Sequence, residues 1–246
     1  MTTAVRPTPP GRVVGHIAAL WRYPVKSMAG HQLPEIHVDW QGLTGDRRWA
    51  FVRPDQEASG FPWLTIRERA QMWGYRPAFV EPDRPNSSPT VVVTPSGAEL
   101  DVVDPRLAAE LGAGVRVLRQ DRGAFDTMPL SLITTQTVEW LSGLVEEELE
   151  MRRFRPNLVV ESTDGGPLQE DTWVGHVLTV GDLRLRLDKH NKRCVIVNTD
   201  PVTAERAPRV LQTIAQERQA YLGVYGSTVQ PGRVAVGDAV VLESPA

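Results

Sequence analysis

The sequence predicts a mainly β protein with a few inserted helices, an α+β chain made of two packed β-barrel-like modules. Short runs rich in valine, isoleucine and aromatic residues recur along the chain, and turn residues separate them. The 246 residues include 20 glycines and 20 prolines, which fits many turns. Few segments space their apolar residues as a helix does. Short, regularly spaced strands are typical of barrels rather than of a parallel sheet wound with helices.

The first half of the chain reads as a series of short strands after a proline-rich tail at residues 1–11, which we expect to be disordered. Strands are expected at residues 13–24, 33–40, 47–53, 75–81, 90–94, 99–103 and 115–119. The motif P-S-G-A joins the strands at 90–94 and 99–103 as a hairpin. Residues 65–72 are expected to be a short helix or an irregular segment, and Pro105 starts a short helix that ends at Leu111.

The second half begins after a joining loop at residues 121–126 and contains the two longer helices. Thr134 or Thr135 is expected to cap a helix that runs to Val145, and a second amphipathic helix is expected at 208–222. Residues 177–187 form the clearest hairpin of the chain, with its turn at 181–182. Further strands are expected at 157–161 and 195–197 and as a final pair around 237–238.

The composition excludes several classes of protein. A net charge of −3 gives no general attraction for nucleic acid or an anionic membrane. The single cysteine excludes an intramolecular disulfide and a cysteine-only metal site, and it fits a reducing compartment. Neither a signal peptide nor a membrane-spanning run is present, so we expect a soluble cytoplasmic protein. No dinucleotide fingerprint, P-loop, zinc-binding helix or G-x-S-x-G motif occurs.

That single cysteine, Cys194, lies in the most informative stretch of the chain, residues 188–201. Lys189, His190, Lys192 and Arg193 precede it closely, and nearby cations favour the thiolate, which is the form that attacks electrophiles and binds soft metals. The alternative is a small buried thiol beside a solvated basic loop. The residues of this stretch alone do not separate the two interpretations.

Four further polar stretches contain the side chains that an anionic heterocyclic ligand needs. Arginine and lysine bind phosphate, and serine, asparagine and aspartate can hydrogen-bond the edges of a ring. Each stretch taken singly is equally compatible with an ordinary charged loop. The four are Y-P-V-K-S at 23–27, G-D-R-R-W at 45–49, F-R-P-N at 154–157 and Q-E-D-T-W at 169–173.

These stretches occur in an order that resembles the MOSC family, in particular its amidoxime-reducing members. The resemblance rests on Y-P-V-K-S, G-L-x-G-D-R-x-W, F-R-P-N, E-D-x-W, R-C followed by D-P, and a terminal G-x-x-x-V-G-D, which together span nearly the whole chain. It identifies residues 12–121 as similar to the MOSC N-terminal β-barrel module and residues 122–246 as similar to the MOSC domain.

The resemblance implies a molybdenum cofactor, Mo-molybdopterin, with Cys194 as the protein ligand of the metal. Soft thiolate sulfur suits such a metal. The other residues that the resemblance places at the cofactor are Lys26, Ser27 and Arg47 at the phosphate end, with Asp126, Thr127, Arg155, Asn157, Asp171, Lys192 and Arg193 around the remainder. Asp126 and Cys194 are the residues expected to take part in catalysis.

The resemblance also implies an oxidoreductase that reduces N-hydroxylated or N-oxide small molecules. The electrons are expected from a separate ferredoxin, flavoprotein or cytochrome, because the chain shows no iron–sulfur cysteine motif. Pyridoxal phosphate is not expected, since no aminotransferase-like region is seen, and neither is a membrane anchor. Two alternatives stay open: a cofactor carrier without turnover, and a persulfide carrier that acts through Cys194.

The chain departs from the family pattern at four positions. Met28 stands where relatives often have cysteine, and Met128 where a small polar residue is expected. Lys192 replaces a frequent serine and adds charge near the metal position. Ala204 stands in place of glycine, so the turn there is expected to differ.

Overall fold

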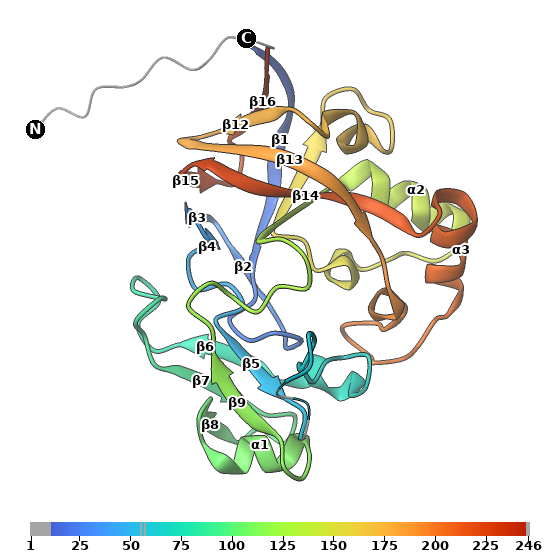
Figure 1. The fold of residues 1–246 in the computed structure, drawn as a ribbon. Helices are drawn as coiled ribbons and strands as arrows, with labels where there is room; N and C mark the ends of the chain where they lie inside the picture. The colour runs from blue at the N-terminus through green and yellow to red at the C-terminus, as the bar shows by residue number, and fades with distance from the viewer. Residues whose placement is uncertain (1–10, 55, 57, 245–246) are drawn as a thin grey trace, which may run out of the picture.

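The structure is a computed structural model, and it describes residues 11–54, 56 and 58–244. Residues 1–10 of the predicted disordered tail lie outside this range, and Gly11 belongs to the first strand rather than to a tail. Strands dominate the described residues, and a larger strand-rich module packs against a smaller one (Figure 1). The predicted mainly β fold class is therefore confirmed.

The larger module is a closed barrel of seven strands. Each strand pairs with the next, and the pairing of β1 with β11 closes the ring. In order around the barrel the strands are β1 (Gly11–Arg22), β11 (Leu158–Ser162), β10 (Leu130–Thr134), β14 (Tyr221–Gln230), β13 (Leu183–Lys192), β12 (Val177–Val180) and β16 (Ala239–Glu243). Strand β2 (His31–Leu33) extends the sheet beside β1. Closure leaves these seven strands without a free edge.

The barrel core follows from the alternation of side chains along its strands. Leu183, Leu185 and Leu187 of β13 are fully buried, whereas the intervening arginines point outward. Strands β12 and β13 form the hairpin predicted at 177–187. Trp173 fills the same core.

The sheets cross the sequence division proposed at residues 121 and 122. Strand β1 completes a barrel built mostly from the second half, and β3 (Glu35–Asp39) pairs with β15 (Gly232–Ala235) and with β4 (Gly42–Leu43). The division of the chain into one module at residues 12–121 and another at residues 122–246 therefore stays a prediction. The final strands β15 and β16 were expected to pair with each other; this was wrong, because β15 instead pairs with β3 in the register Val234–Ile36.

The smaller module has its own apolar core and short strands. Strand β5 (Trp49–Val52) pairs with β9 (Arg116–Arg119), and β7 (Thr90–Val93) lies between β6 (Arg76–Phe79) and β8 (Glu99–Asp101). Pro77 is tolerated because β6 is an edge strand. The predicted helix α1 (Pro105–Leu111) is confirmed, and the Asp104 carboxylate caps it by accepting from the Arg106 N–H. Helix η1 (Ala70–Gly74) is a single 3₁₀ segment.

Helices α2 (Thr135–Val145) and α3 (Arg209–Arg218) lie side by side against the barrel (Figure 1). The Thr134 hydroxyl accepts from the Thr137 N–H, which confirms the predicted cap of α2. The second helix was predicted to reach residue 222, but it ends at Arg218. Gln219 and Ala220 adopt left-handed backbone there, and the chain turns directly into β14.

Of three further short 3₁₀ helices, η2 (Met151–Phe154) and η4 (Val195–Asn198) lie where the modules meet. The third, η3 (Gln169–Trp173), packs against barrel strands β10 and β14. The strand predicted at 195–197 was wrong, because this run forms η4. Strand β13 pairs Lys192 with Tyr221, the first residue of β14, so the residues beyond it have no partner strand. Val195 is 51% exposed and therefore does not enter a core.

Candidate functional site

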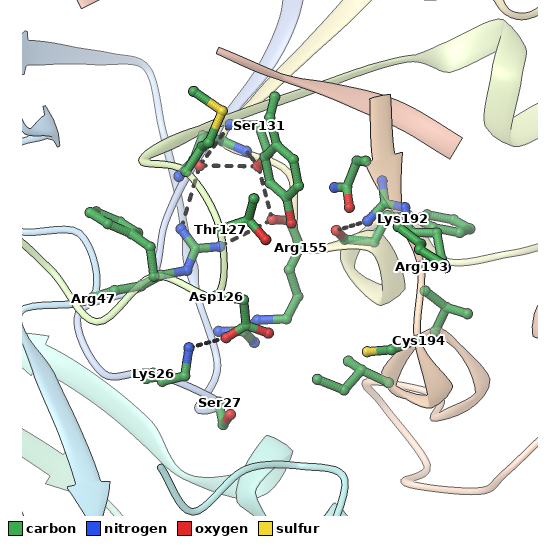
Figure 2. Close-up of a pocket in the computed structure, with 18 of the residues that line it drawn as sticks. Lys26, Ser27, Arg47, Asp126, Thr127, Ser131, Arg155, Lys192, Arg193 and Cys194 are labelled. Carbon is green, nitrogen blue, oxygen red and sulfur yellow. Dashed lines mark hydrogen bonds and ion pairs between the residues drawn. The ribbon is translucent and has the colours of Figure 1, made fainter. Parts of the chain in front are cut away.

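A cavity of about 460 Å³ lies where the two modules meet. Ten of the eleven residues predicted at the cofactor line it: Lys26, Ser27, Arg47, Asp126, Thr127, Arg155, Asn157, Lys192, Arg193 and Cys194. Figure 2 shows Cys194 on one side of this space, with Lys26, Ser27 and Arg47 on the other and Asp126 between them. The fold thus brings together residues that lie up to 168 positions apart in the sequence (Lys26 to Cys194).

Asp46 is the residue that joins three of the sequence motifs. Its carboxylate is fully buried and accepts from the Tyr23 N–H at 2.7 Å and from Asn157 Nδ2 at 3.2 Å. It also forms an ion pair with the guanidinium of Arg47. A buried carboxylate needs such donors, because an unpaired charge is costly away from water. Asp46 therefore holds Y-P-V-K-S, G-D-R-R-W and F-R-P-N at one point.

Asn157 is used in the same internal network. Its Nδ2 also donates to the Trp21 carbonyl at 3.2 Å, and its Oδ1 accepts from the Ser131 hydroxyl at 3.1 Å. The side chain lines the cavity, but its polar atoms already have protein partners. Asn157 therefore supports the cavity wall in the present arrangement.

Three of the predicted site residues adopt left-handed backbone, namely Ser27 (φ 66°), Arg47 (φ 49°) and Arg155 (φ 49°). This region costs an ordinary L-residue about 1–2 kcal/mol. Such conformations persist where the surroundings impose them, and they cluster at functional sites. The backbone at these three positions is thus set by the cavity rather than by local preference.

The guanidinium of Arg155 is held by a backbone carbonyl of another residue and by two aromatic rings. Its Nη1 donates to the Met28 carbonyl at 2.8 Å, and its guanidinium lies 4.1 Å from the ring centre of Tyr23 and 4.8 Å from that of Trp73. Burial lowers the pKa of Arg155 to about 10. Its Nη2 is buried with no hydrogen-bond partner in the described part of the chain. A buried donor without a partner in the cavity wall is available to a ligand that brings an acceptor.

The cavity is strongly basic. Among the described residues, seven basic side chains line it and Asp126 supplies the one carboxylate; the seven are Lys26, Arg47, Arg67, Arg153, Arg155, Lys192 and Arg193. Arg193 donates to the carbonyls of Leu222 (2.7 Å) and Phe154 (2.9 Å), and burial lowers its pKa. The arrangement favours a ligand that carries several negative charges.

Lys26 and Asp126 form the charged pair at the centre of this wall. Lys26 Nζ donates to the Ala124 carbonyl at 2.8 Å and forms an ion pair with Asp126. Burial lowers the pKa of Lys26 to about 8, although Asp126 opposes this shift. Burial alone would raise the pKa of Asp126, but the charges of Lys26 and Arg67 outweigh it and hold that pKa below its usual value.

Arg67 is the site residue that the sequence did not reveal. Its Nη2 lies 2.8 Å from Asp126 Oδ2 and 3.3 Å from the Sγ atom of Cys194. Burial lowers the pKa of Arg67, but Cys194 and Asp126 more than offset this and raise it overall. The smaller module therefore places a cation directly on the thiol of the larger one.

A local signal for Arg67 does exist in T-I-R-E at residues 65–68. The pattern T-x-x-E is a capping box, and Glu68 Oε2 accepts from the Thr65 N–H at 2.9 Å. The Thr65 hydroxyl accepts in turn from the Arg67 N–H at 3.3 Å. Ile66 is buried at this turn, so the next side chain, Arg67, faces the cavity.

Asp171 is the one predicted residue that does not line the cavity. It forms an ion pair with Arg218 and lies 3.6 Å from His190 Nε2. The neighbouring Glu170 is fully buried instead and accepts from the hydroxyls of Thr134 (2.8 Å) and Thr137 (2.9 Å). The E-D-x-W motif thus anchors the start of α2.

The four departures from the family pattern have distinct surroundings. Met28 is fully buried in the core of the smaller module, and Met128 lines the cavity. Lys192 is an exposed residue of the cavity wall. Ala204 keeps a left-handed backbone, with φ at 59°, where glycine would be unstrained.

The cavity residues fit the cofactor that the sequence predicts. A thiol suits a soft metal, the basic wall suits a phosphate, and Arg155 Nη2 is a donor in need of an acceptor. The side chains of Ser27, Thr127 and Lys192 make no hydrogen bond within the described residues, so they too can bind a ligand.

The chain is thus a two-module β protein, a closed barrel packed on a smaller β module, with a thiol in a basic cavity between them. Comparison with known families makes this class specific. Residues 14–148 match the MOSC N-terminal beta barrel domain, and residues 119–241 match the MOSC domain. The chain therefore belongs to the MOSC family.

Relatives with assigned names fall into two groups. The chain is 24% identical to mitochondrial amidoxime-reducing component 1 of Mus musculus, over 93% of this chain and 82% of the relative. It is 30% identical to mitochondrial amidoxime reducing component 2 of Macaca fascicularis over 47% of this chain, which corresponds to 37% of that relative. It is also 30% identical to molybdenum cofactor sulfurase of Drosophila mojavensis, over 89% of this chain but 34% of the relative.

Among solved structures, the YUAD protein from Bacillus subtilis aligns over 95% of this chain and 97% of its own, with a TM-score of 0.49 and 12% identity. YiiM from Geobacillus stearothermophilus aligns over 47% of this chain and 54% of its own, with a TM-score of 0.38 and 15% identity. Across the described residues, every helix is too short or too polar to cross a membrane.

Proposed function

We propose that this protein binds Mo-molybdopterin in the cavity between its modules and reduces N-hydroxylated or N-oxide small molecules. The observation that carries the proposal is the placement of one thiol, Cys194, in the same basic cavity as Lys26, Arg47 and Arg155. Relatives named amidoxime-reducing components support the reaction class.

The residues divide the binding task between them. Lys26, Arg47 and Arg155 hold the phosphate, because they form the basic wall opposite Cys194 (Figure 2). The free hydroxyls of Ser27 and Thr127 add neutral hydrogen bonds to the ligand. Asn157 and Arg193 act mainly by fixing the wall, since Asn157 and the Nε and Nη1 atoms of Arg193 already have protein partners. Asp171 does not line the cavity and contributes no direct contact in this proposal.

Cys194 is the protein ligand of the metal in this proposal. Its Sγ lines the cavity and accepts from Arg67 Nη2 at 3.3 Å, so the sulfur lies where a soft metal could bind it. When bound, the molybdenum centre supplies the two-electron redox chemistry that no protein side chain provides.

Asp126 acts as a hydrogen-bond acceptor at the reacting end of the cavity. Lys26 and Arg67 keep its pKa low, so it stays ionised at neutral pH. An ionised carboxylate can accept a hydrogen bond from an N–OH group and so orient that group toward the Cys194 side. Asp126 therefore positions the substrate proton.

Electrons come from a separate redox protein of the ferredoxin, flavoprotein or cytochrome type in this proposal. The relatives named amidoxime-reducing components support a reductase. The electron donor can be identified by supplying a ferredoxin, a flavoprotein and a cytochrome in turn. The protein is proposed to work in the cytoplasm on a small-molecule substrate.

Turnover is tested with protein produced in a host that makes the cofactor. Benzamidoxime and a chemically reduced electron donor are supplied, and benzamidine is measured by chromatography. The proposal predicts benzamidine formation that Cys194→Ser abolishes. Cofactor-loaded protein that forms no benzamidine with any donor would overturn the reductase proposal.

That negative result would support a second candidate, a cofactor carrier. The observation favouring it is the alignment of a molybdenum cofactor sulfurase over 89% of this chain. A protein that carries a persulfide on Cys194 and no metal would support the third candidate, a sulfur carrier.

A further inference from the structure

Arg67 occupies a position that neither metal binding nor phosphate binding explains. It belongs to the smaller module, yet its Nη2 reaches both Asp126 Oδ2 (2.8 Å) and Cys194 Sγ (3.3 Å) of the larger module. A molecule that reacts beside Cys194 therefore meets this guanidinium.

Arg67 has hydrogen-bonding capacity left after these contacts. Both of them use Nη2, and its Nη1 and Nε have no hydrogen-bond partner among the described residues. The side chain is 30% exposed, so a small molecule can reach it. Each of these free N–H groups can donate to an anionic oxygen.

Phe61 gives this guanidinium a fixed platform. The Arg67 guanidinium lies 5.1 Å from the ring centre of Phe61, and Lys26 Nζ lies 5.5 Å from the same centre. Cation–π contact restricts the side chain without using its hydrogen-bond donors. Arg67 is thus oriented in advance.

Apart from the exposed Lys192, the other basic residues are engaged more deeply in the wall. Arg47 is paired with Asp46, and Arg153 with Glu147 and Asp200. Arg193 is held by two backbone carbonyls. Arg67 remains as a partly exposed cation in hydrogen-bonding contact with the thiol.

We propose that Arg67 is a specificity residue: it receives an anionic oxygen of the molecule that approaches Cys194. This role rests on the proposed function. It means that the preferred substrates are N-oxygenated compounds that carry an oxyanion, rather than neutral or cationic ones. Asp126 opposes this preference, because the negative charge of its carboxylate repels the oxyanion that Arg67 attracts.

The test uses the cofactor-free protein and needs no turnover. Cys194, the only cysteine of the chain, is alkylated with iodoacetate, an anion, and with iodoacetamide, its neutral analogue. In each case the thiolate displaces iodide and a thioether forms. The ratio of the two rate constants cancels the fraction of thiolate, because both reagents attack the same sulfur.

Arg67→Gln is expected to lower the ratio of iodoacetate to iodoacetamide rates about fourfold, which corresponds to losing one unit charge about 5 Å from the reagent in a water-like dielectric. Asp126→Asn is expected to raise the ratio by a similar factor. Arg67→Lys keeps the charge and should retain most of the ratio. Added salt should shrink all these differences.

Arg69→Gln is the matched control. It removes the same charge two residues away on an exposed side chain that does not line the cavity, so the ratio should not move. An unchanged ratio in Arg67→Gln, or an equal fall in Arg69→Gln, would overturn the role of Arg67. Cofactor content is measured separately, so either result leaves the proposed function standing.

Discussion

Replacing Asp46 by asparagine perturbs the point at which three motifs of the cavity meet. In the protein the carboxylate accepts from the Tyr23 N–H and Asn157 Nδ2 and pairs with Arg47. An asparagine can accept from Tyr23 through Oδ1, but its NH₂ group then faces two other donors. Arg47 also loses the carboxylate that balances its charge.

The expected loss of stability is large because the site is fully buried. Removing one partner of a buried ion pair costs about 3–5 kcal/mol. For a chain of this size, that loss lowers the melting temperature by roughly 6–20 °C. Binding of an anionic ligand should weaken as well, since Arg47 and Arg155 are joined through the same network.

The measurement is urea and thermal unfolding of Asp46→Asn beside Asp164→Asn. Asp164 pairs with Arg12 on the surface, where such pairs contribute about 0–1 kcal/mol, so this control should unfold almost as the wild type does. A loss below about 1 kcal/mol in Asp46→Asn, equal to the control, would refute the reasoning that Asp46 holds the cavity together.

Three further outcomes are expected. Ala204→Gly should stabilise the protein by roughly 0.5–1 kcal/mol in urea unfolding, because it relieves a left-handed backbone; no gain would contradict this. Gly223→Ala should destabilise it by about 1–3 kcal/mol, since the new Cβ would lie 2.8 Å from the Leu132 carbonyl oxygen and 3.1 Å from Arg193 Nη2, and wild-type stability would show that the backbone yields. Sulfate binding, followed by calorimetry, should weaken as the pH rises through about 8, where buried Lys26 loses its charge, and Lys26→Met should remove that step. A pH-independent affinity in the wild type would count against Lys26 as an anion ligand.

The sequence predicted those parts of the fold that local patterns determine. The alternation of Leu183, Leu185 and Leu187 predicted the hairpin, and Thr134 predicted the helix cap. The run at 195–197 has the same β-branched composition as a strand, but it has no partner beyond Lys192, so it forms a 3₁₀ turn. Pairing partners are a property of the whole chain, and composition does not report them.

The site divides in a similar way. The motif residues converge, because the buried Asp46 draws their segments together. Asp171 was predicted near the cofactor but behind its direct contacts, and this stays a prediction. Glu170 beside it takes the buried position, and Asp171 pairs with Arg218. The capping box at residues 65–68 predicts a local turn around Arg67, but it does not predict the contact of Arg67 with Cys194, because that contact crosses the boundary between the modules.

The central claim is that Cys194 anchors a molybdenum cofactor in this cavity. The most direct test is the molybdenum and pterin content of protein purified from a cofactor-producing host, beside Cys194→Ser made in the same way. We expect close to one molybdenum and one pterin per chain in the wild type, and strong loss of molybdenum in the variant with pterin partly retained by the basic wall. A wild-type protein with neither molybdenum nor pterin, or a variant that keeps its metal in full, would contradict the claim.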